Sequence, residues 1–223
     1  LLTVMTLFFV AIGQYLGGSG GMKLAFVFAL IMNIGSYWFS DKIILKIYKA
    51  REIDPKEFPD VIEIFSSFCK KAEMSEPKLF IYSSDDPNAF ATGSSKNNSL
   101  IAISSGLISN MSRNEVEAVI GHEMSHVANG DMVTLALIQG IVNAFVIFFS
   151  RVIGHFVDRV ILKNERGYGI GYFFTVIFAQ VVLGILASTI VMWYSRQREY
   201  RADYGGAMLT SKEDMIASLR ALE

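Results

Sequence analysis

Four long runs of apolar residues divide the chain, and each carries no charge. They cover residues 1–16, 24–39, 132–150 and 167–195, and Lys23 is the one charge among the first 40 residues. A helix that spans a membrane needs about 20 mostly apolar residues. The third and fourth runs reach that length, and the second is at its short end. The pattern predicts a multi-pass membrane protein with four transmembrane helices in two hairpins.

Two of these runs have a second interpretation. The first, followed by Gly-Gly-Ser-Gly-Gly, also resembles a cleaved secretory signal, and the fourth could be a buried core helix. The second run follows the first at once, as in a membrane hairpin, and the fourth is too long for a core helix in a chain of 223 residues. We therefore favour four spans. Because the first run begins at residue 1, we expect the chain to be a fragment whose ends are missing.

The segment between the two hairpins reads as a small α+β domain. Residues 57–74 have apolar side chains at helical spacing. Residues 77–83 and 100–103 are apolar, rich in β-branched side chains and bounded by turn formers, which indicates strands. Between them, residues 88–93 predict a further extended piece and then a turn.

A second helix is predicted over residues 113–128. Ser112 and Glu115 fit a capping box, in which each side chain accepts a hydrogen bond from the other residue's backbone. Met111 and Val116 stand where a hydrophobic staple would form. Asn129-Gly130 is a helix-ending signal. This helix contains the candidate functional residues His122, Glu123 and His126.

Composition and charge narrow the class of protein. The chain is 52% hydrophobic and 18% charged, with a mean hydropathy of +0.40, which excludes a disordered chain. One cysteine excludes a disulfide scaffold. A net charge of −1 argues against nucleic-acid binding. Five cations follow the second span and predict that this end is cytoplasmic: Lys42, Lys46, Lys49, Arg51 and Lys56.

The predicted helix over residues 113–128 contains the pattern His-Glu-x-x-His. His122 and His126 are four residues apart, so their imidazoles share one helix face and can bind one zinc ion. Glu123 is offset by about 100° and can take a proton from a zinc-bound water. The alternative is two surface histidines and a solvated carboxylate. The capped helix around the motif favours the metal site.

Catalytic zinc usually has three protein ligands and one open position. His155 is separated from His126 by a membrane span, and Cys69 falls on the apolar face of its helix, so both are poor candidates. Glu199 follows the fourth span, with Asp203 four residues later and able to hydrogen-bond a ligand imidazole. Two spans separate His126 from Glu199, which returns the chain to the same side of the membrane. An ordinary juxtamembrane cluster of salt bridges remains the alternative.

Three motifs, in this order, resemble the HtpX-type family of bacterial membrane zinc metalloproteases, relatives of the CAAX prenyl endopeptidases. They are Asn88-Ala-Phe-Ala-Thr-Gly93, His122-Glu-Met-Ser-His-Val-Ala-Asn-Gly-Asp-Met132 and Ser195-Arg-Gln-Arg-Glu-Tyr-Arg-Ala-Asp203. The resemblance implies a gluzincin-type α+β zinc endopeptidase. Its ligands to a single zinc ion would be His122, His126 and Glu199, and Glu123 would be the general base and acid.

The resemblance further implies a role in the quality control of misfolded membrane proteins. The enzyme would lie in the bacterial inner membrane, with its active site facing the cytoplasm and polypeptides as substrates. Asn88, Ala89, Phe90 and Ala91 would belong to an edge strand that pairs with substrate backbone, although a polar turn is the alternative. The expected units are a transmembrane hairpin over 1–40, a cytoplasmic metalloprotease domain over 41–131, a second hairpin over 132–195 and a cytoplasmic helix with the third zinc ligand over 196–223.

Two other function classes fit parts of the pattern. A non-catalytic scaffold or transporter subunit could hold zinc structurally, but structural zinc sites are normally four-coordinate and rich in cysteine. A zinc-dependent lipid hydrolase is compatible with the motif. Three residues near Glu199 are candidates for stabilising an oxyanion, without a preference among them: Arg196, Arg198 and Tyr200.

Overall fold

The described part of the chain forms two compact units. One combines residues up to Met132 with Ala202–Glu223, and the other is Val133–Arg201. The predicted span over residues 1–16 and much of the one over 24–39 lie outside the described residues, so the count of four spans stays a prediction. The computed structural model describes residues 17–21, 23–28, 31, 41–164 and 168–222.

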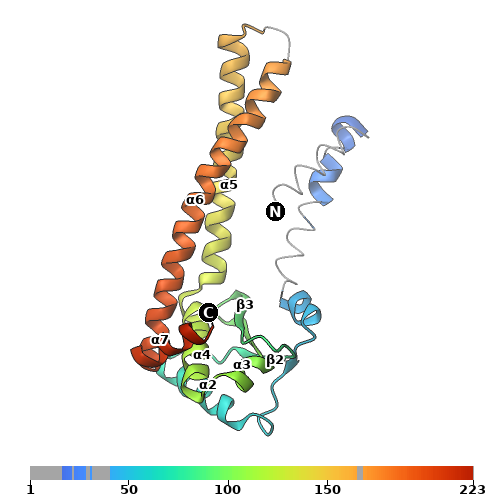
Figure 1. Ribbon diagram of the computed structural model, residues 1–223. Coiled ribbons are helices and arrows are strands. Elements are labelled where there is room, and N and C mark those ends of the chain that lie inside the picture. Colours follow the sequence, from blue (N-terminus) through green and yellow to red (C-terminus); the bar gives the residue numbers. More distant parts are fainter. Residues whose placement is uncertain (1–16, 22, 29–30, 32–40, 165–167, 223) are drawn as a thin grey trace. The chain divides into compact units, whose positions relative to one another are not determined.

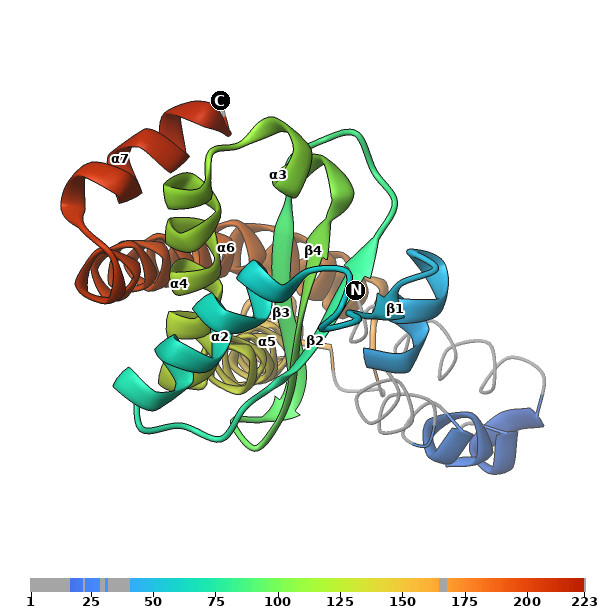
Figure 2. The same cartoon turned by 90° about the horizontal axis from the view of Figure 1, so that it is seen from below.

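A four-stranded mixed sheet is the centre of the first unit (Figure 2). The two inner strands, β2 and β4, are parallel, and each outer strand pairs antiparallel with its neighbour. The extended piece predicted after residue 88 is β3, which lies at an edge of the sheet. The strand order is β1 (Arg51–Glu52), β2 (Lys78–Tyr82), β4 (Asn98–Ser104) and β3 (Ala89–Ser95).

The inner strand β4 is buried on both of its faces, which explains its continuous apolar sequence. Ile101 and Ile103 join the main core with side chains of the helices α2 (Pro59–Lys71) and α4 (Arg113–Asn129). Leu100 and Ala102 point the other way and pack with Tyr82 in a second cluster.

The helix predicted over residues 57–74 is shorter than expected. It is α2, Pro59–Lys71. Proline at the first helical position needs no hydrogen-bond partner for its nitrogen, so the helix begins there and not two residues earlier. At the other end, Glu73 has a φ of 50°, which takes the backbone out of the helical conformation. Local backbone geometry sets both ends.

The helix predicted over residues 113–128 is confirmed as α4, Arg113–Asn129. Its capping box is formed in both directions between Ser112 and Glu115. These hydrogen bonds to Ser112 lower the pKa of Glu115. Gly130 ends the helix in the left-handed conformation, at a φ of 69°. The unit also contains α3 (Ser105–Asn110) and α7 (Lys212–Ala221), and α7 packs on α4.

Two long helices form the second unit, apart from the start of one before Val133 and the end of the other after Arg201, which belong to the first unit (Figure 1). They are α5 (Asp131–Phe156), continued by a π-helical turn at Val157–Ile161, and α6 (Ile170–Leu209). Both are long and apolar enough to cross a membrane. The predicted boundary after residue 195 falls inside α6, which continues without a break. His155 lies near the end of α5.

Many large apolar side chains of this hairpin are exposed. On α6 they include Phe174 and Phe178, both 71% exposed, and Trp193 at 62%. A helix that is apolar all round belongs in a protein core or in a membrane. Since these faces are exposed, a lipid environment fits them.

Candidate metal centre

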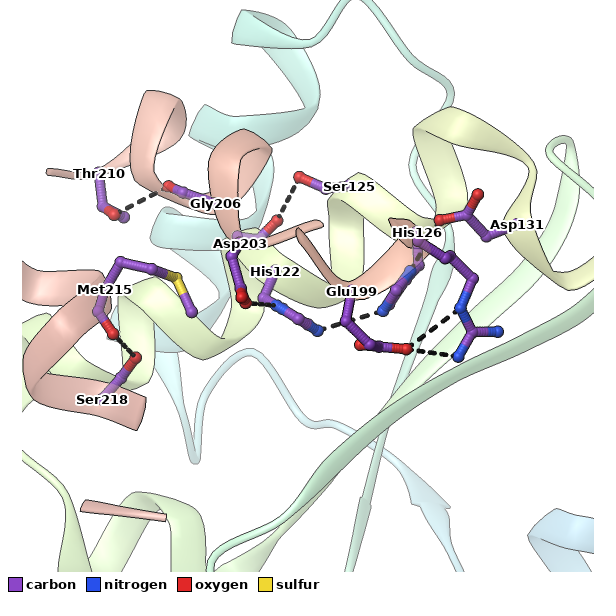
Figure 3. Close-up of polar contacts among 12 residues, drawn as sticks. His122, Ser125, His126, Asp131, Glu199, Asp203, Gly206, Thr210, Met215 and Ser218 are labelled. Carbon is purple, nitrogen blue, oxygen red and sulfur yellow. Dashed lines mark hydrogen bonds and ion pairs between the residues drawn. The ribbon is translucent and has the colours of Figure 1, made fainter. Parts of the chain in front are cut away.

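The helix α4 places the two motif histidines one turn apart on one face. The capping box fixes its first turn, and the left-handed Gly130 fixes its last. His126 is 9% exposed, and His122 is half-buried. Their rings meet edge to face, and the two Nε2 atoms are 3.1 Å apart (Figure 3).

Small residues let α6 approach α4 closely. A Cβ atom added at Gly206 would lie 3.0 Å from the backbone nitrogen of His122. One added at Gly121 would lie 3.3 Å from the Cα of Gly206. Gly205 faces the Ser125 side chain in the same way. Sequence reasoning did not single out these glycines, although Gly205-Gly206 inside a helix was a visible signal.

The third candidate ligand, Glu199, stands one turn before Asp203 on the continuous helix α6. Ligand atoms of His122, His126 and Glu199 all lie within 4.8 Å of one another. The structure therefore brings together the three residues that the sequence nominated. Glu199 also accepts two hydrogen bonds from Arg198, at 2.6 and 3.1 Å, so the salt bridge and the ligand set coexist.

A carboxylate holds each imidazole from behind. Nδ1 of His122 lies 2.9 Å from Asp203 Oδ1, and Nδ1 of His126 lies 2.9 Å from Asp131 Oδ2. An ionised carboxylate only accepts hydrogen bonds, so each Nδ1 is the donor. In neutral imidazoles both Nε2 atoms then present lone pairs to the same small space. Two lone pairs 3.1 Å apart repel each other unless a cation lies between them.

This donor set fits zinc. Two nitrogen ligands at about 2.0–2.1 Å with a tetrahedral angle at zinc lie roughly 3.3 Å apart, close to the observed spacing. A carboxylate or carbonyl behind each ligand imidazole is the usual arrangement in zinc proteins. Sequence reasoning missed Asp131. The signal was its place directly after Gly130, where the chain turns back toward His126.

The remaining sequence candidates lie elsewhere. Cys69 is 3% exposed in the core, and burial raises the pKa of its thiol to about 11, so it stays neutral. His155 packs against Tyr168 and Tyr172. Arg196 and Tyr200 are exposed on α6, and neither has a described contact that favours an oxyanion role.

Glu123 is half-buried beside His122 on α4. Its surroundings include the end of β2, where burial raises the pKa of the Tyr82 phenol and the negative charge of Glu123 adds a smaller effect in the same direction. Ala89, Phe90 and Ala91 lie in the edge strand β3, and Asn88 directly precedes it. Asn88 exchanges hydrogen bonds with Ser104, donating its backbone N–H to the hydroxyl and accepting from the backbone N–H.

A histidine pair on a capped helix, a carboxylate close enough to complete a metal site and a glutamate beside the pair form the arrangement expected of a metallopeptidase. The chain belongs to Peptidase family M48, whose sequence profile matches residues 55–222.

Within this family, the chain is similar to proteins named Protease HtpX. It is 60% identical over 163 residues to Protease HtpX of Alkalilimnicola ehrlichii, covering 73% of this chain and 54% of the relative. It is 59% identical over 214 residues to Protease HtpX of Thioalkalivibrio sulfidiphilus, covering 92% and 72%. The chain thus spans about half the length of the first of these relatives.

The fold is also that of a solved structure, the crystal structure of S. mikatae Ste24p. The TM-score is 0.64 at 19% identity, and the match covers 99% of this chain and 55% of that one. At this identity the likeness concerns the fold. The M48 peptidase fold with two candidate membrane helices is therefore established for this chain.

Proposed function

We propose that this protein is a membrane-embedded zinc endopeptidase that hydrolyses peptide bonds in polypeptide substrates. The observation that carries the proposal is the convergence of His122, His126 and Glu199 on one point, with Asp131 and Asp203 behind the imidazoles. The two histidines and Glu199 would hold one zinc ion. Membership of a peptidase family supports the same reaction class.

The bound zinc would polarise the scissile carbonyl and bring the pKa of a water molecule toward about 7. Glu123 accepts the proton of the attacking water and then delivers it to the leaving amine. Asp131 and Asp203 keep each imidazole in the tautomer whose Nε2 faces the site. The role of Glu123 follows from its place next to His122, beside the ligand face of α4.

Substrate backbone would pair with β3 at the edge of the sheet, in the manner of an added strand. Residues 88–91 are the proposed binding segment. An edge strand presents unpaired backbone donors and acceptors, which bind an extended peptide without regard to its side chains. Such binding suits a protease that acts on many misfolded proteins.

The proposed location is the bacterial inner membrane, with the site facing the cytoplasm and a role in the quality control of membrane proteins. Two features support it. The exposed apolar faces of α5 and α6 fit lipid. The cations between Lys42 and Lys56 precede the catalytic segment and mark a cytoplasmic end.

The test uses Glu123→Gln, which keeps the shape of the side chain and removes the base. General acid–base assistance is worth about 10²–10⁴-fold, so cleavage of casein should fall by that factor. Bound zinc, measured by atomic absorption, should stay at the wild-type level. Chelation should abolish wild-type cleavage, and zinc should restore it. Near-normal cleavage by the variant, or chelator-resistant cleavage, would contradict the proposal.

A further inference from the structure

The candidate metal centre lies where the apolar runs of both long helices end. Asp131, which holds His126, is the first residue of α5, and the next charge along the chain is Arg151. On α6 no charge occurs from Ile170 to Ser195, and Glu199 follows four residues later. Two helices thus independently place the donor set at the border between apolar and polar sequence.

Aromatic side chains locate that border on α6. Tyr and Trp gather at both membrane–water interfaces, where their rings lie at the level of the headgroups. Tyr172 and Trp193 are 21 residues apart on one continuous helix, which corresponds to about 31 Å. The hydrocarbon core of a bilayer is about 30 Å thick. The two rings therefore match its two surfaces.

The same helix measures the distance from this surface to the metal ligand. Glu199 follows Trp193 by six residues, or about 9 Å along the axis. The headgroup layer on each side of a bilayer is about 5–8 Å thick. On a helix that crosses the bilayer upright, Glu199 would lie just outside the headgroups, at a height set by a continuous helix and not by a flexible loop.

From this height we propose that the protease selects peptide bonds that lie a few residues from a membrane-embedded segment of the substrate. The inference rests on the proposed function and adds a rule of position to it: the distance of a peptide bond from the membrane-embedded segment decides how readily it is cleaved. An extended chain advances at most about 3.3–3.6 Å per residue, so roughly three residues bridge the 9 Å from the level of Trp193, at the surface of the hydrocarbon core, to the level of Glu199. Bonds closer than that cannot reach the site.

Bonds farther away reach the site with lower probability. The effective concentration of a tethered segment is highest when the root-mean-square length of its linker matches the span. A Gly/Ser linker of about three residues has such a length near 9 Å. Beyond this, effective concentration falls roughly as the −3/2 power of linker length, so lengthening from 4 to 32 residues should reduce cleavage about 20-fold.

The experiment uses the full-length protease in liposomes and a series of single-span substrates. Each substrate carries the same cleavable segment after 4, 8, 16 or 32 Gly/Ser residues on the active-site side. Matched controls carry the same linkers and segment without the membrane span. We expect the initial rate to fall about 20-fold from the shortest to the longest linker in the anchored series, and to stay constant in the soluble series.

A flat profile in the anchored series, with chelator-sensitive cleavage retained, would overturn the rule of position and leave the proposed function intact. Absence of cleavage of every substrate, soluble casein included, would overturn both.

A second measurement is independent of activity. Trp38→Phe leaves Trp193 as the one tryptophan of this chain, and lipids brominated at different depths quench its fluorescence. Quenching should be strongest with bromine near the headgroup. Stronger quenching by bromine at the chain ends would place Trp193 in the bilayer centre and contradict the 9 Å distance.

Discussion

The two imidazole–carboxylate pairs at the metal centre differ in burial. The side chain of Asp131 is 3% exposed, whereas that of Asp203 is 30% exposed. A buried charge is tolerated when it is paired, and its cost is several kilocalories per mole when it is not. Asp131 therefore depends on His126 more than Asp203 depends on His122. The orientation of His126 is correspondingly the more firmly fixed of the two.

Zinc content should rank the acidic residues of α6 by their distance from the metal. Glu199→Ala leaves two ligands and should remove most of the bound zinc. Asp203→Ala leaves three ligands and loses only the support of His122, which should cost about 10–100-fold in affinity or activity. Glu213→Ala, an exposed change on α7, serves as the control. Wild-type zinc occupancy in Glu199→Ala would place the third ligand among the acids of residues 41–131.

At the scale of the elements, the helices α6 and α4 touch at a glycine, Gly206, and this contact sets how closely the two helices approach at the candidate site. The approach of Gly206 to the backbone of His122 is so close that a side chain at residue 206 would require the neighbouring backbone to shift by a few tenths of an ångström. Backbone atoms cannot rotate away as a side-chain end can. The two helices can therefore lie this close because residue 206 is a glycine and has no Cβ atom.

Gly206→Ala should destabilise the protein and weaken zinc binding together. Its Cβ would lie 3.0 Å from the His122 nitrogen and 3.1 Å from the Met215 sulfur, and overpacking of this kind costs about 1–3 kcal/mol. Gly184→Ala is the matched control, because that glycine lies on the same helix with no described atom within 4 Å of an added Cβ. Thermal unfolding and zinc titration of both variants provide the test. Equal melting temperatures would contradict the tight contact.

Sequence patterns predicted what depends on neighbouring residues and missed what depends on tertiary contacts. The caps of α4 were predictable because Ser112, Glu115 and Gly130 act locally. The length of α6 was not, because its apolar run ends at residue 195 whereas the helix continues to Leu209. Its continuation, Arg-Gln-Arg-Glu, consists of good helix formers. Asp131 was missed because its hydrogen bond to His126 depends on the left-handed backbone conformation at Gly130.

For the whole molecule, the shared site requires that the segments carrying His126 and Glu199 lie on the same side of the membrane. Reporter fusions after residues 100 and 210 should therefore both behave as cytoplasmic. The cations from Lys42 to Lys56 are the reason why we expect this side to be the cytoplasm and not the periplasm. Alkaline phosphatase and green fluorescent protein at each position give opposite readouts. A periplasmic result at 210 would separate Glu199 from the histidines and exclude the proposed ligand set.

The separation of the donor set along the chain has a consequence for biosynthesis. His122 and its partner Asp203 are 81 residues apart, with the whole hairpin of α5 and α6 between them. At a synthesis rate of about 5–20 residues per second, the histidine helix leaves the ribosome roughly 4–16 s before that partner does. During this interval the nascent chain has its proposed general base, Glu123, but an incomplete set of the proposed ligands. Under the proposed function, proteolytic competence would begin only after the hairpin has been made, and an unfinished chain would not digest the ribosome-bound chains around it.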